Sequence, residues 1–457
     1  MSLTPEGAAS TTTGRLSKRT IATYAIGSLG TGGFATLPGL VLLFFMTDTL
    51  GVFPLLAGVL ISVAKIWDVI IDPVIGARSD HSLAVTGSRR RYMVLGAVLL
   101  PVFFVLTFAV PPGLPPLASG LWVLVAFMAT ATAFSLFQVP YIALPAELAE
   151  GYHQRTRLLS VRVVVLTLAI LLFGAGGPEL VALGGGNEHL GYLLMAVVAG
   201  VVIGVGMLIS SRSAPRGVAV DAVRTSLVDN YRAGLSALRR SQPFRALLGA
   251  FALQGLATGI MLAGAAYVAT YVLHDRSALT FLFVALIAPA IFFAPVWQLV
   301  ARRLGKERGF VLATILYGVA AVSLVAMLWA PGWWVYISVG LAGAGYAGMQ
   351  SLPMAMLPDV ISHDASRHGA GSAGTFGGVW TAGETTGMAL GATALSIVLQ
   401  ATGFIETTGA SFAWQPGTAT AGIALSFSAL PAVIIALSLV VFARYRLRRE
   451  DIDADAR

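Results

Sequence analysis

Two aspartates lie one helical turn apart inside a stretch that otherwise has the composition of a membrane span. Asp68 and Asp72 fall within residues 52–77, and Lys65 precedes Asp68 by three positions. This spacing directs the three side chains to one face of a helix. An ionised carboxylate at bilayer depth costs about 2.5–3.5 kcal/mol even on the lenient insertion scale. The pattern is typical of a site that holds a cation, with Lys65 neutralising the pair when the cation is absent. A structural Lys–Asp ion pair is the alternative.

The composition is that of an integral membrane protein. The chain has 457 residues, of which 57% are hydrophobic and 11% are charged, whereas soluble domains typically carry about 25% charged residues. The absence of cysteine excludes disulfides and thiolate metal sites. Residues 1–19 are polar and show no signal-peptide cleavage site, so we expect a cytoplasmic N-terminal tail.

The hydrophobic blocks predict about twelve membrane-spanning helices. Their approximate centres are residues 33, 66, 101, 130, 167, 200, 257, 290, 320, 347, 386 and 431. Basic residues gather in alternate loops, and the intervening loops hold only Arg276. This positive-inside pattern predicts that both termini are cytoplasmic. The net charge of +8 therefore reflects membrane topology and not a nucleic-acid-binding surface.

The order of the blocks predicts an all-α membrane protein in two halves. A polar linker at residues 212–243, with helical periodicity at 225–238, separates a six-helix bundle at 20–211 from another at 244–444. A cytoplasmic tail follows at 445–457. Residues 139–145 (VPYIALP) match residues 352–358 (LPMAMLP) in the spacing of two prolines. Parallel six-helix repeats are the architecture of the major facilitator superfamily. The second half has no acids matching Asp68 and Asp72, which favours a site over a scaffold role.

Two further charged residues lie within predicted spans. Arg162 would pair with Asp68 or Asp72, or bind a polar or anionic substrate through its planar guanidinium. The alternative is that it snorkels to the membrane interface. Glu384 lies well inside the eleventh span, where an ionisable residue is functional by default. The alternative is that neighbouring hydroxyls or a kinked backbone satisfy it.

Other polar and aromatic residues are candidates for a pocket, although each alone is more often a packing residue. They are Ser135, Gln138, Tyr141, Tyr346, Gln350 and Trp380. Asp80 leads into Arg89 and Arg90, a pattern that predicts a charge latch at the cytoplasmic face. The chain has no Walker loop and no histidine pair at metal-ligand spacing. An intramembrane aspartyl protease would need its two acids on separate elements. We therefore predict a transporter, not an enzyme, with no cofactor.

Several motifs resemble those of the glycoside–pentoside–hexuronide cation symporters. They are residues 65–76 (KIWDVIIDPVIG) with 87–92 (GSRRRY), 357–360 (LPDV) with the glycine-rich 369–378, and 24–27 (YAIG) with 45–48 (FMTD). The resemblance implies that Asp68, Asp72 and Ser135 bind the coupling cation, that Lys65 matches the family's basic residue, and that Arg162 lies near the substrate. Galactoside-binding acids of this family are replaced by Gly32 and Gln138, and a lysine of the eleventh helix by Ala382.

The resemblance implies a monomeric symporter of the cytoplasmic membrane that works by alternating access. We expect Na⁺ or H⁺ as the coupling cation and a small polar solute, such as a sugar, glycoside or uronide unlike melibiose, as substrate. Sodium-dependent lysolipid symporters share this fold, so a lysolipid or another non-sugar solute is the alternative.

Overall fold

The computed structural model describes residues 16–148, 152–215, 236, 238–368, 373–408 and 414–447. Within these residues the chain is helical, apart from connections and one isolated bridge between Leu50 and Thr408. Most of the predicted linker, including most of its helical stretch at 225–238, lies outside the described residues. So do most of both predicted tails.

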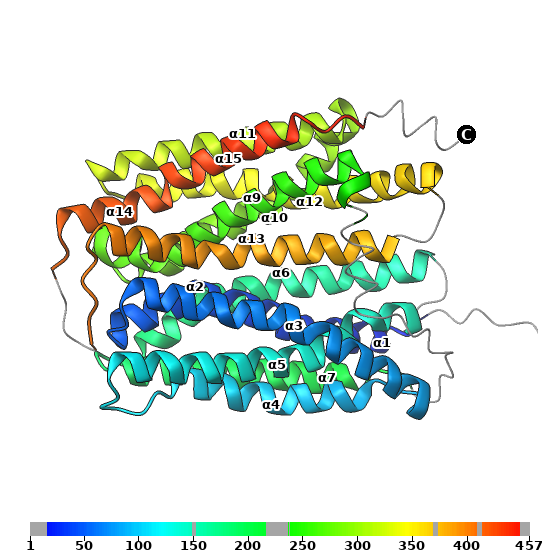
Figure 1. Ribbon diagram of the computed structural model, residues 1–457, viewed down its shortest axis with the longest axis horizontal. Helices are drawn as coiled ribbons and strands as arrows, with labels where there is room; N and C mark the ends of the chain where they lie inside the picture. Colours follow the sequence, from blue (N-terminus) through cyan, green and yellow to red (C-terminus); the bar gives the residue numbers. More distant parts are fainter. Residues whose placement is uncertain are drawn as a thin grey trace, which may run out of the picture.

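The N-terminal half runs from α1 to α7 (Figure 1). Its elements are α1 (Lys18–Ala25), α2 (Ser28–Phe44), the π-helical turn η1 (Phe45–Thr49), α3 (Pro54–Thr86), α4 (Arg90–Phe108), α5 (Pro116–Leu148), α6 (Tyr152–Ala182) and α7 (Glu188–Ser211). Helix α4 packs on α5 and α7, α3 packs on α5, and α2 packs on α6.

The C-terminal half runs from α9 to α15 and forms the upper layer in Figure 1. Its elements are α9 (Gln242–Tyr267), the π-helical turn η2 (Val268–Val272), α10 (Ala278–Leu304), α11 (Lys306–Ser323), the 3₁₀ turn η3 (Leu324–Leu328), α12 (Trp334–His368), α13 (Ala373–Ala401), α14 (Gly417–Phe427) and α15 (Ala429–Phe442). Helix α9 packs on α13 and α15, and α12 packs on α10 and α11.

Eleven helical segments of the described chain are long and apolar enough to cross a membrane. Every predicted span centre falls inside a long helix. Helix α12, which contains the predicted centre at residue 347, has 35 residues but is not one of the eleven. Its glycines and polar side chains lower its hydropathy, although its length is more than the roughly 20 residues that a span needs.

Helix α3 positions the acidic pair, and its ends follow from local sequence. Pro54 occupies the first turn, where its missing N–H is not needed. Gly87 ends the helix in the left-handed conformation at φ 64°, which glycine adopts without a Cβ clash, and its N–H donates to the Leu83 carbonyl. The 33 residues between them extend over about 50 Å.

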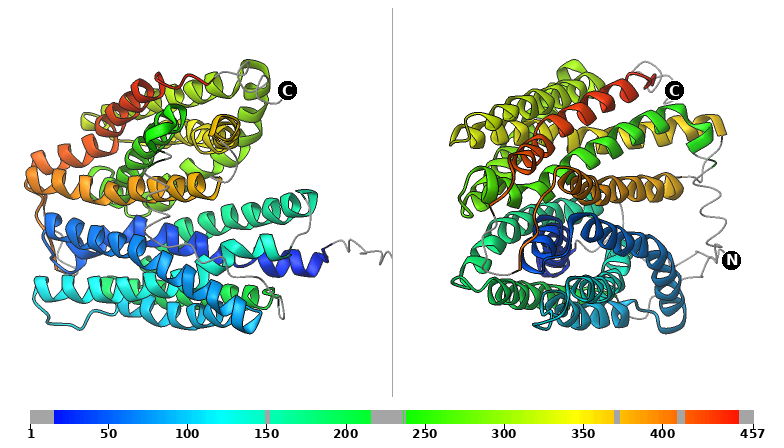
Figure 2. Two further views of the ribbon diagram at one scale, coloured as in Figure 1. Left: turned by 45° about the vertical axis from the view of Figure 1, so that its right-hand side comes forward. Right: turned by 60° about the vertical axis from the view of Figure 1, so that its left-hand side comes forward.

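The two halves form separate layers that touch through pairs of helices (Figure 2). The pairs are α3 with α13, α6 with α10, and α2 with α9. A Cβ on Gly58 would lie 1.9 Å from Ser396 Oγ, and the Ser62 and Thr393 hydroxyls hydrogen-bond nearby. Small residues therefore let α3 and α13 approach closely along the first turns of α3.

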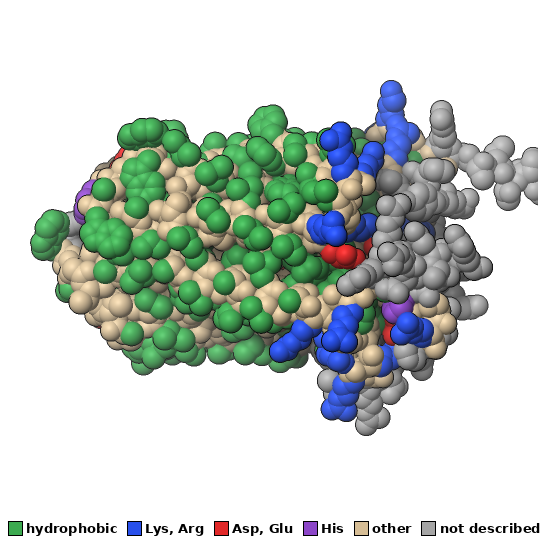
Figure 3. Space-filling view, turned by 90° about the horizontal axis from the view of Figure 1, so that it is seen from above, with side chains coloured by type: hydrophobic (Ala, Val, Ile, Leu, Met, Phe, Trp, Pro, Cys, Tyr) green, Lys and Arg blue, Asp and Glu red, His purple; other side chains and the backbone are tan. Residues whose placement is uncertain are grey.

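The surface divides into an apolar body and a basic end. Figure 3 shows lysine and arginine side chains gathered at one end of the molecule, while hydrophobic side chains cover the surface between the ends. We call this the basic end and the opposite one, which carries Arg276, the outer end. An apolar belt with a basic edge is typical of a membrane protein with a cytoplasmic side.

The α4–α5 contact yields a stability prediction. A Cβ on Gly96 would lie 2.6 Å from the carbonyl oxygen of Ala133 and 2.7 Å from the Phe137 nitrogen, so the helix backbones would have to separate. Gly96→Ala should lower the free energy of unfolding by about 1–3 kcal/mol. Thermal unfolding of detergent-solubilised protein measures this. Gly176→Ala is the matched control, because no atom lies within 4 Å of that Cβ; equal stability of the two variants would contradict the packing.

Candidate functional site

One turn of α3 carries the two aspartates into the interior of the N-terminal half. Lys65 Nζ lies 3.4 Å from Asp68 Oδ2. No ion pair reaches Asp72 among the described residues. Oδ1 of Asp68 and Oδ1 of Asp72 are both buried without a hydrogen-bond partner. Because unsatisfied buried oxygens are costly, this turn has unused capacity to bind a cation.

Helix α5 supplies a hydroxyl to the same place. Ser135 is buried, and its hydroxyl lies near the Asp72 carboxylate. Trp67 Nε1 donates to Thr132 Oγ1 at 2.8 Å, which holds α3 against α5 at this level. The structure thus brings Asp68, Asp72 and Ser135 together. Two carboxylates and a hydroxyl are hard oxygen ligands of the kind that suit a small cation. Their role in binding one stays a prediction.

Lys65 is held by aromatic rings as well as by Asp68. Its Nζ lies 5.6 Å from the ring centroid of Phe34 and 5.5 Å from that of Phe127, within cation–π range. The Lys65 side chain keeps 27% of its exposure and the Asp68 side chain 15%. The acidic turn is therefore neither turned away from solvent nor fully neutralised by a basic partner. No group of three His, Cys, Asp or Glu residues in the described chain forms a metal centre.

Arg162 and Tyr141 form a second cluster in the N-terminal half. Arg162 Cζ lies 5.2 Å from the Tyr141 ring centroid, and Arg162 Nε is buried without a hydrogen-bond partner. The buried Nε argues against a side chain that snorkels to the interface. No ion pair joins Arg162 to either aspartate of α3 in the described residues, so the expected pairing is not formed.

Tyr141 and Gln138 serve packing contacts in this conformation. Tyr141 is fully buried, and its hydroxyl donates to the Tyr24 carbonyl at 3.1 Å. Gln138 accepts a hydrogen bond from Thr31 Oγ1 at 2.8 Å, which ties α5 to α2. Their predicted contact with substrate has no support from this arrangement alone.

The C-terminal half gathers three other predicted residues. Gln350 Nε2 donates to Tyr346 Oη at 3.0 Å on α12, and Tyr346 lies within electrostatic range of Glu384 on α13. Glu384 has no ion-pair partner among the described residues. Trp380 is 2% exposed and stacks on Phe251 with centroids 4.5 Å apart. It therefore packs in the core of its half here.

The predicted latch at the basic end is a network centred on Arg89. Arg89 binds Asp80, donates to Glu147 Oε1 at 2.6 Å and contacts Ser79 Oγ at 3.1 Å. Burial lowers the pKa of Arg89, but Glu147 and Asp80 raise it above its ordinary value overall. Arg90 begins α4, and its backbone N–H binds Ser88 Oγ at 3.2 Å. Sequence reasoning missed Glu147, whose position two residues after Pro145 in the repeated motif was the available signal.

The C-terminal half has a related contact. Lys306 Nζ lies 2.5 Å from Asp359 Oδ2 and donates to the Ala355 carbonyl at 3.0 Å. Asp359 comes one residue after Pro358 on α12, and Glu147 comes two residues after Pro145 on α5. Each half thus joins neighbouring helices at the basic end through a basic side chain paired with an acid just after a repeated proline.

A charged network that the sequence reasoning missed joins the halves at the outer end. Arg276 Nη1 lies 2.6 Å from Glu188 Oε1, and Arg276 Nη2 lies 3.7 Å from Asp48 Oδ2. Tyr271 donates to Asp48 Oδ1. Burial lowers the pKa of Arg276, but Glu188 and Asp48 raise it above its ordinary value overall, so it stays charged. Two features of the sequence could have indicated this network. Asp48 is an acid in an apolar span, and Arg276 is the one basic residue in the loops predicted to lie on the outer side of the membrane.

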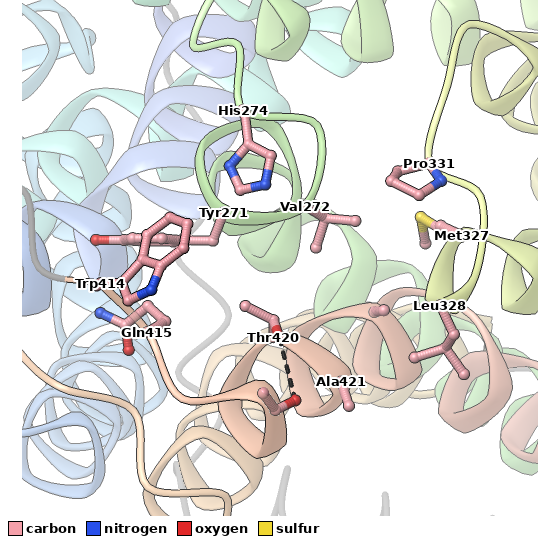
Figure 4. A pocket seen from close by; sticks show the side chains of 12 residues that line it. Tyr271, Val272, His274, Met327, Leu328, Pro331, Trp414, Gln415, Thr420 and Ala421 are labelled. Carbon is pink, nitrogen blue, oxygen red and sulfur yellow. Dashed lines mark hydrogen bonds between the residues drawn. The ribbon is translucent and has the colours of Figure 1, made fainter.

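Three notable cavities lie away from the acidic turn. One of about 490 Å³ lies at the outer end of the C-terminal half. Figure 4 shows Trp414 and Gln415 on one side of it and Met327 and Pro331 across from them. A second, of about 330 Å³, lies between α2, α6, α7 and the C-terminal half. A third, of about 320 Å³, lies at the basic end. None of the predicted site residues lines any of these three cavities.

Fold and acidic turn together define a membrane transporter of the major facilitator superfamily. A family model described as "MFS/sugar transport protein" matches residues 23–449, and the chain belongs to this family. The match confirms the predicted kinship with glycoside–pentoside–hexuronide symporters and the prediction of a transport protein rather than an enzyme.

Individual relatives agree with this assignment. The isoprimeverose transporter of Lactiplantibacillus pentosus is 25% identical over 427 residues, covering 89% of this chain and 84% of the relative. The sodium-dependent lysophosphatidylcholine symporter 1 of Mus musculus is 24% identical over 446 residues, covering 90% and 82%. A solved D-xylose-proton symporter aligns with a TM-score of 0.68 at 13% identity, covering 95% of this chain and 98% of its own. The last likeness shows the fold alone.

The Arg89 network generates a prediction with an internal comparison. The Glu147 side chain is 10% exposed and the Asp80 side chain 62% exposed, although both bind Arg89. Glu147→Gln should lower the free energy of unfolding by about 3 kcal/mol, because it breaks a buried pair. Asp80→Asn should lower it by less than about 1 kcal/mol, because its charge is already screened by solvent. Thermal unfolding in detergent measures both, and a larger loss for Asp80→Asn would contradict the assignment.

Proposed function

We propose that this protein is a cation-coupled symporter that imports a small polar solute, such as a sugar, glycoside or uronide. Na⁺ or H⁺ is the coupling ion, and no other cofactor takes part. Binding of the cation raises the affinity for the solute, and binding of the solute raises the affinity for the cation by the same factor. Kinship with the isoprimeverose transporter supports the solute class.

One observation carries the proposal. Two carboxylates lie on one turn of a membrane helix, and each has a buried oxygen without a hydrogen-bond partner. Lys65 contacts Asp68 but forms no ion pair with Asp72. In a purely structural role, these oxygens would have hydrogen-bond or ion-pair partners within the protein. A site that binds and releases a cation must leave them free to coordinate it. Ser135 completes a set of oxygen ligands beside Asp72.

The topology follows from the same proposal. We take α12 as the twelfth span, which gives each half six spans and brings both termini to the basic end, in the cytoplasm. The protein then works as a monomer in the cytoplasmic membrane. Arg162 and Gln138 from one half, with Tyr346, Gln350 and Glu384 from the other, face the solute during the cycle. Tyr141 and Trp380 support them from the core.

Alternating access supplies the mechanism. The halves meet at the outer end through Gly58 with Ser396, Thr47 with Tyr267, and Arg276 with Glu188. At the basic end, the Arg89 and Lys306 networks each stay within one half. This distribution supports a state closed to the outside and ready to open toward the cytoplasm.

A lysolipid substrate is the second candidate. Kinship with the lysophosphatidylcholine symporter favours it. So does the cavity of about 330 Å³ between the halves, which combines apolar residues of α2 and α6 with the charged Arg276 and Glu188. An amphipathic solute would need that combination.

Transport by purified protein in liposomes tests the coupling site. Asp72→Asn should abolish accumulation of solute driven by an imposed Na⁺ or pH gradient. The amide has no negative charge, so it can neither bind Na⁺ as a carboxylate does nor take up and release a proton. Uptake of labelled D-xylose, D-glucuronate and lysophosphatidylcholine under each gradient identifies solute class and ion together. Glu406→Gln is the matched control, since Glu406 is an exposed acid outside the acidic turn. Undiminished gradient-driven accumulation by Asp72→Asn would refute the site.

A further inference from the structure

The outer network differs from the other charged contacts because it crosses between the halves. Asp48 and Thr49 belong to η1, and Glu188 begins α7, in the N-terminal half. Tyr271 belongs to η2 and Arg276 to the loop that follows it, in the C-terminal half. Thr49 Oγ1 donates to Glu188 Oε2 at 2.9 Å, and Thr407 donates to the Asp48 backbone carbonyl and to Asp48 Oδ1. Opening of the outer end must break the bonds that cross between the halves, which are those of Asp48 with Tyr271 and Thr407 and that of Arg276 with Glu188.

The network holds two buried acids and one base. The side chains of Asp48 and Glu188 are 3% and 8% exposed, whereas that of Arg276 is 58% exposed. Arg276 lies 2.6 Å from Glu188 but 3.7 Å from Asp48. Glu188 is therefore the carboxylate that the guanidinium neutralises, and the negative charge of Asp48 lacks an equivalent partner.

Around Asp48, no second positive charge comes from the part of the chain that the structure describes. The titratable groups facing it from each packed element are Glu188 and Tyr192 of α7, Tyr267 of α9, Tyr271 of η2 and Arg276 of the connecting loop. An ionised carboxylate buried among tyrosines and a second acid is costly, and a bound proton removes that cost. A proton on Oδ2 leaves Oδ1 able to accept from Tyr271 and Thr407.

We propose that Asp48, Tyr271 and Arg276 form an outer latch that closes with uptake of one proton by Asp48 from the outer medium, separately from the Asp68–Asp72 site. The latch holds the halves together in the state described here. When it opens, Asp48 meets water, releases the proton and becomes an ordinary carboxylate. The three side chains are positioning residues: they set how readily the outer end opens, and they do not touch the transported solute. The latch rests on the alternating access of the proposed function.

Cysteine labelling measures opening directly, because the chain has no cysteine of its own. Ser396→Cys introduces a thiol of nearly the same size at a fully buried position between α3 and α13. A membrane-impermeant maleimide added outside right-side-out vesicles reacts with it only when the outer end opens. The readout needs neither a known solute nor a coupling ion, so failure of the latch and failure of the symport proposal are distinguishable.

Two variants in this background should differ in labelling rate. Tyr271→Phe removes one hydrogen bond and should raise the labelling rate about fivefold. Asp48→Asn resembles the protonated acid and should leave labelling slow, with no pH dependence beyond that of the thiol itself. Glu406→Gln, an exposed acid next to Thr407, should leave the rate unchanged. Unchanged labelling in Tyr271→Phe, or faster labelling in Asp48→Asn, would overturn the proposal.

The pH dependence of Ser396→Cys alone needs no latch variant and covers the case in which one fails to fold. The thiolate is the species that reacts with maleimide, so each rate is divided by that of Glu406→Cys, an exposed thiol that reports the thiolate fraction at the same pH. Lowering the external pH should lower this ratio, by up to about tenfold per pH unit for the uptake of one proton. The sign follows because the closed state binds one more proton than the open state. A ratio that rises or stays constant as the pH falls would contradict proton uptake by the latch.

Discussion

The constraint that organises this protein is negative charge held inside an apolar bundle. A carboxylate away from water needs a cation, a proton or several donors. Asp68 and Asp72 are each left with a buried, unpartnered oxygen, and the surrounding helices hold that turn in place: Trp67 fixes α3 to α5, and Ser135 approaches from the same side. The long α3, with its glycine cap, is the element that carries this charge through the apolar layer.

Charge is also distributed unequally along the long axis. At the basic end, Arg89 and Lys306 each satisfy acids of their own half. At the outer end, Arg276 reaches across to Glu188 in the other half. Contacts within a half survive a rocking motion, whereas contacts between halves have to break and reform. The same kinds of side chain therefore hold each half together at the basic end and join the two halves at the outer end.

The two halves share architecture but not chemistry. Each joins two helices through a basic residue bound to an acid just after a repeated proline, Glu147 in one half and Asp359 in the other. Only the N-terminal half has the acidic turn, while the C-terminal half contributes Glu384 with Tyr346 and Gln350 nearby. Under the proposed function, the N-terminal half binds the cation and both halves contact the solute.

The sequence by itself determined the class of protein and the location of the acidic turn, because hydropathy, loop charge and the i, i+4 spacing of Asp68 and Asp72 are local properties. It also predicted that Asp80 and Arg89 pair. It did not indicate Glu147, nor the contacts of Asp48, Tyr271, Glu188 and Arg276, because these residues lie far apart in the chain. Burial of Tyr141 and Trp380, and the missing Arg162–aspartate pair, also depended on the tertiary structure. Which face of a membrane helix is covered by another helix depends on the packing of α6 on α2 and of α13 on α9. That packing decides whether a side chain such as Arg162 or Trp380 is buried between helices.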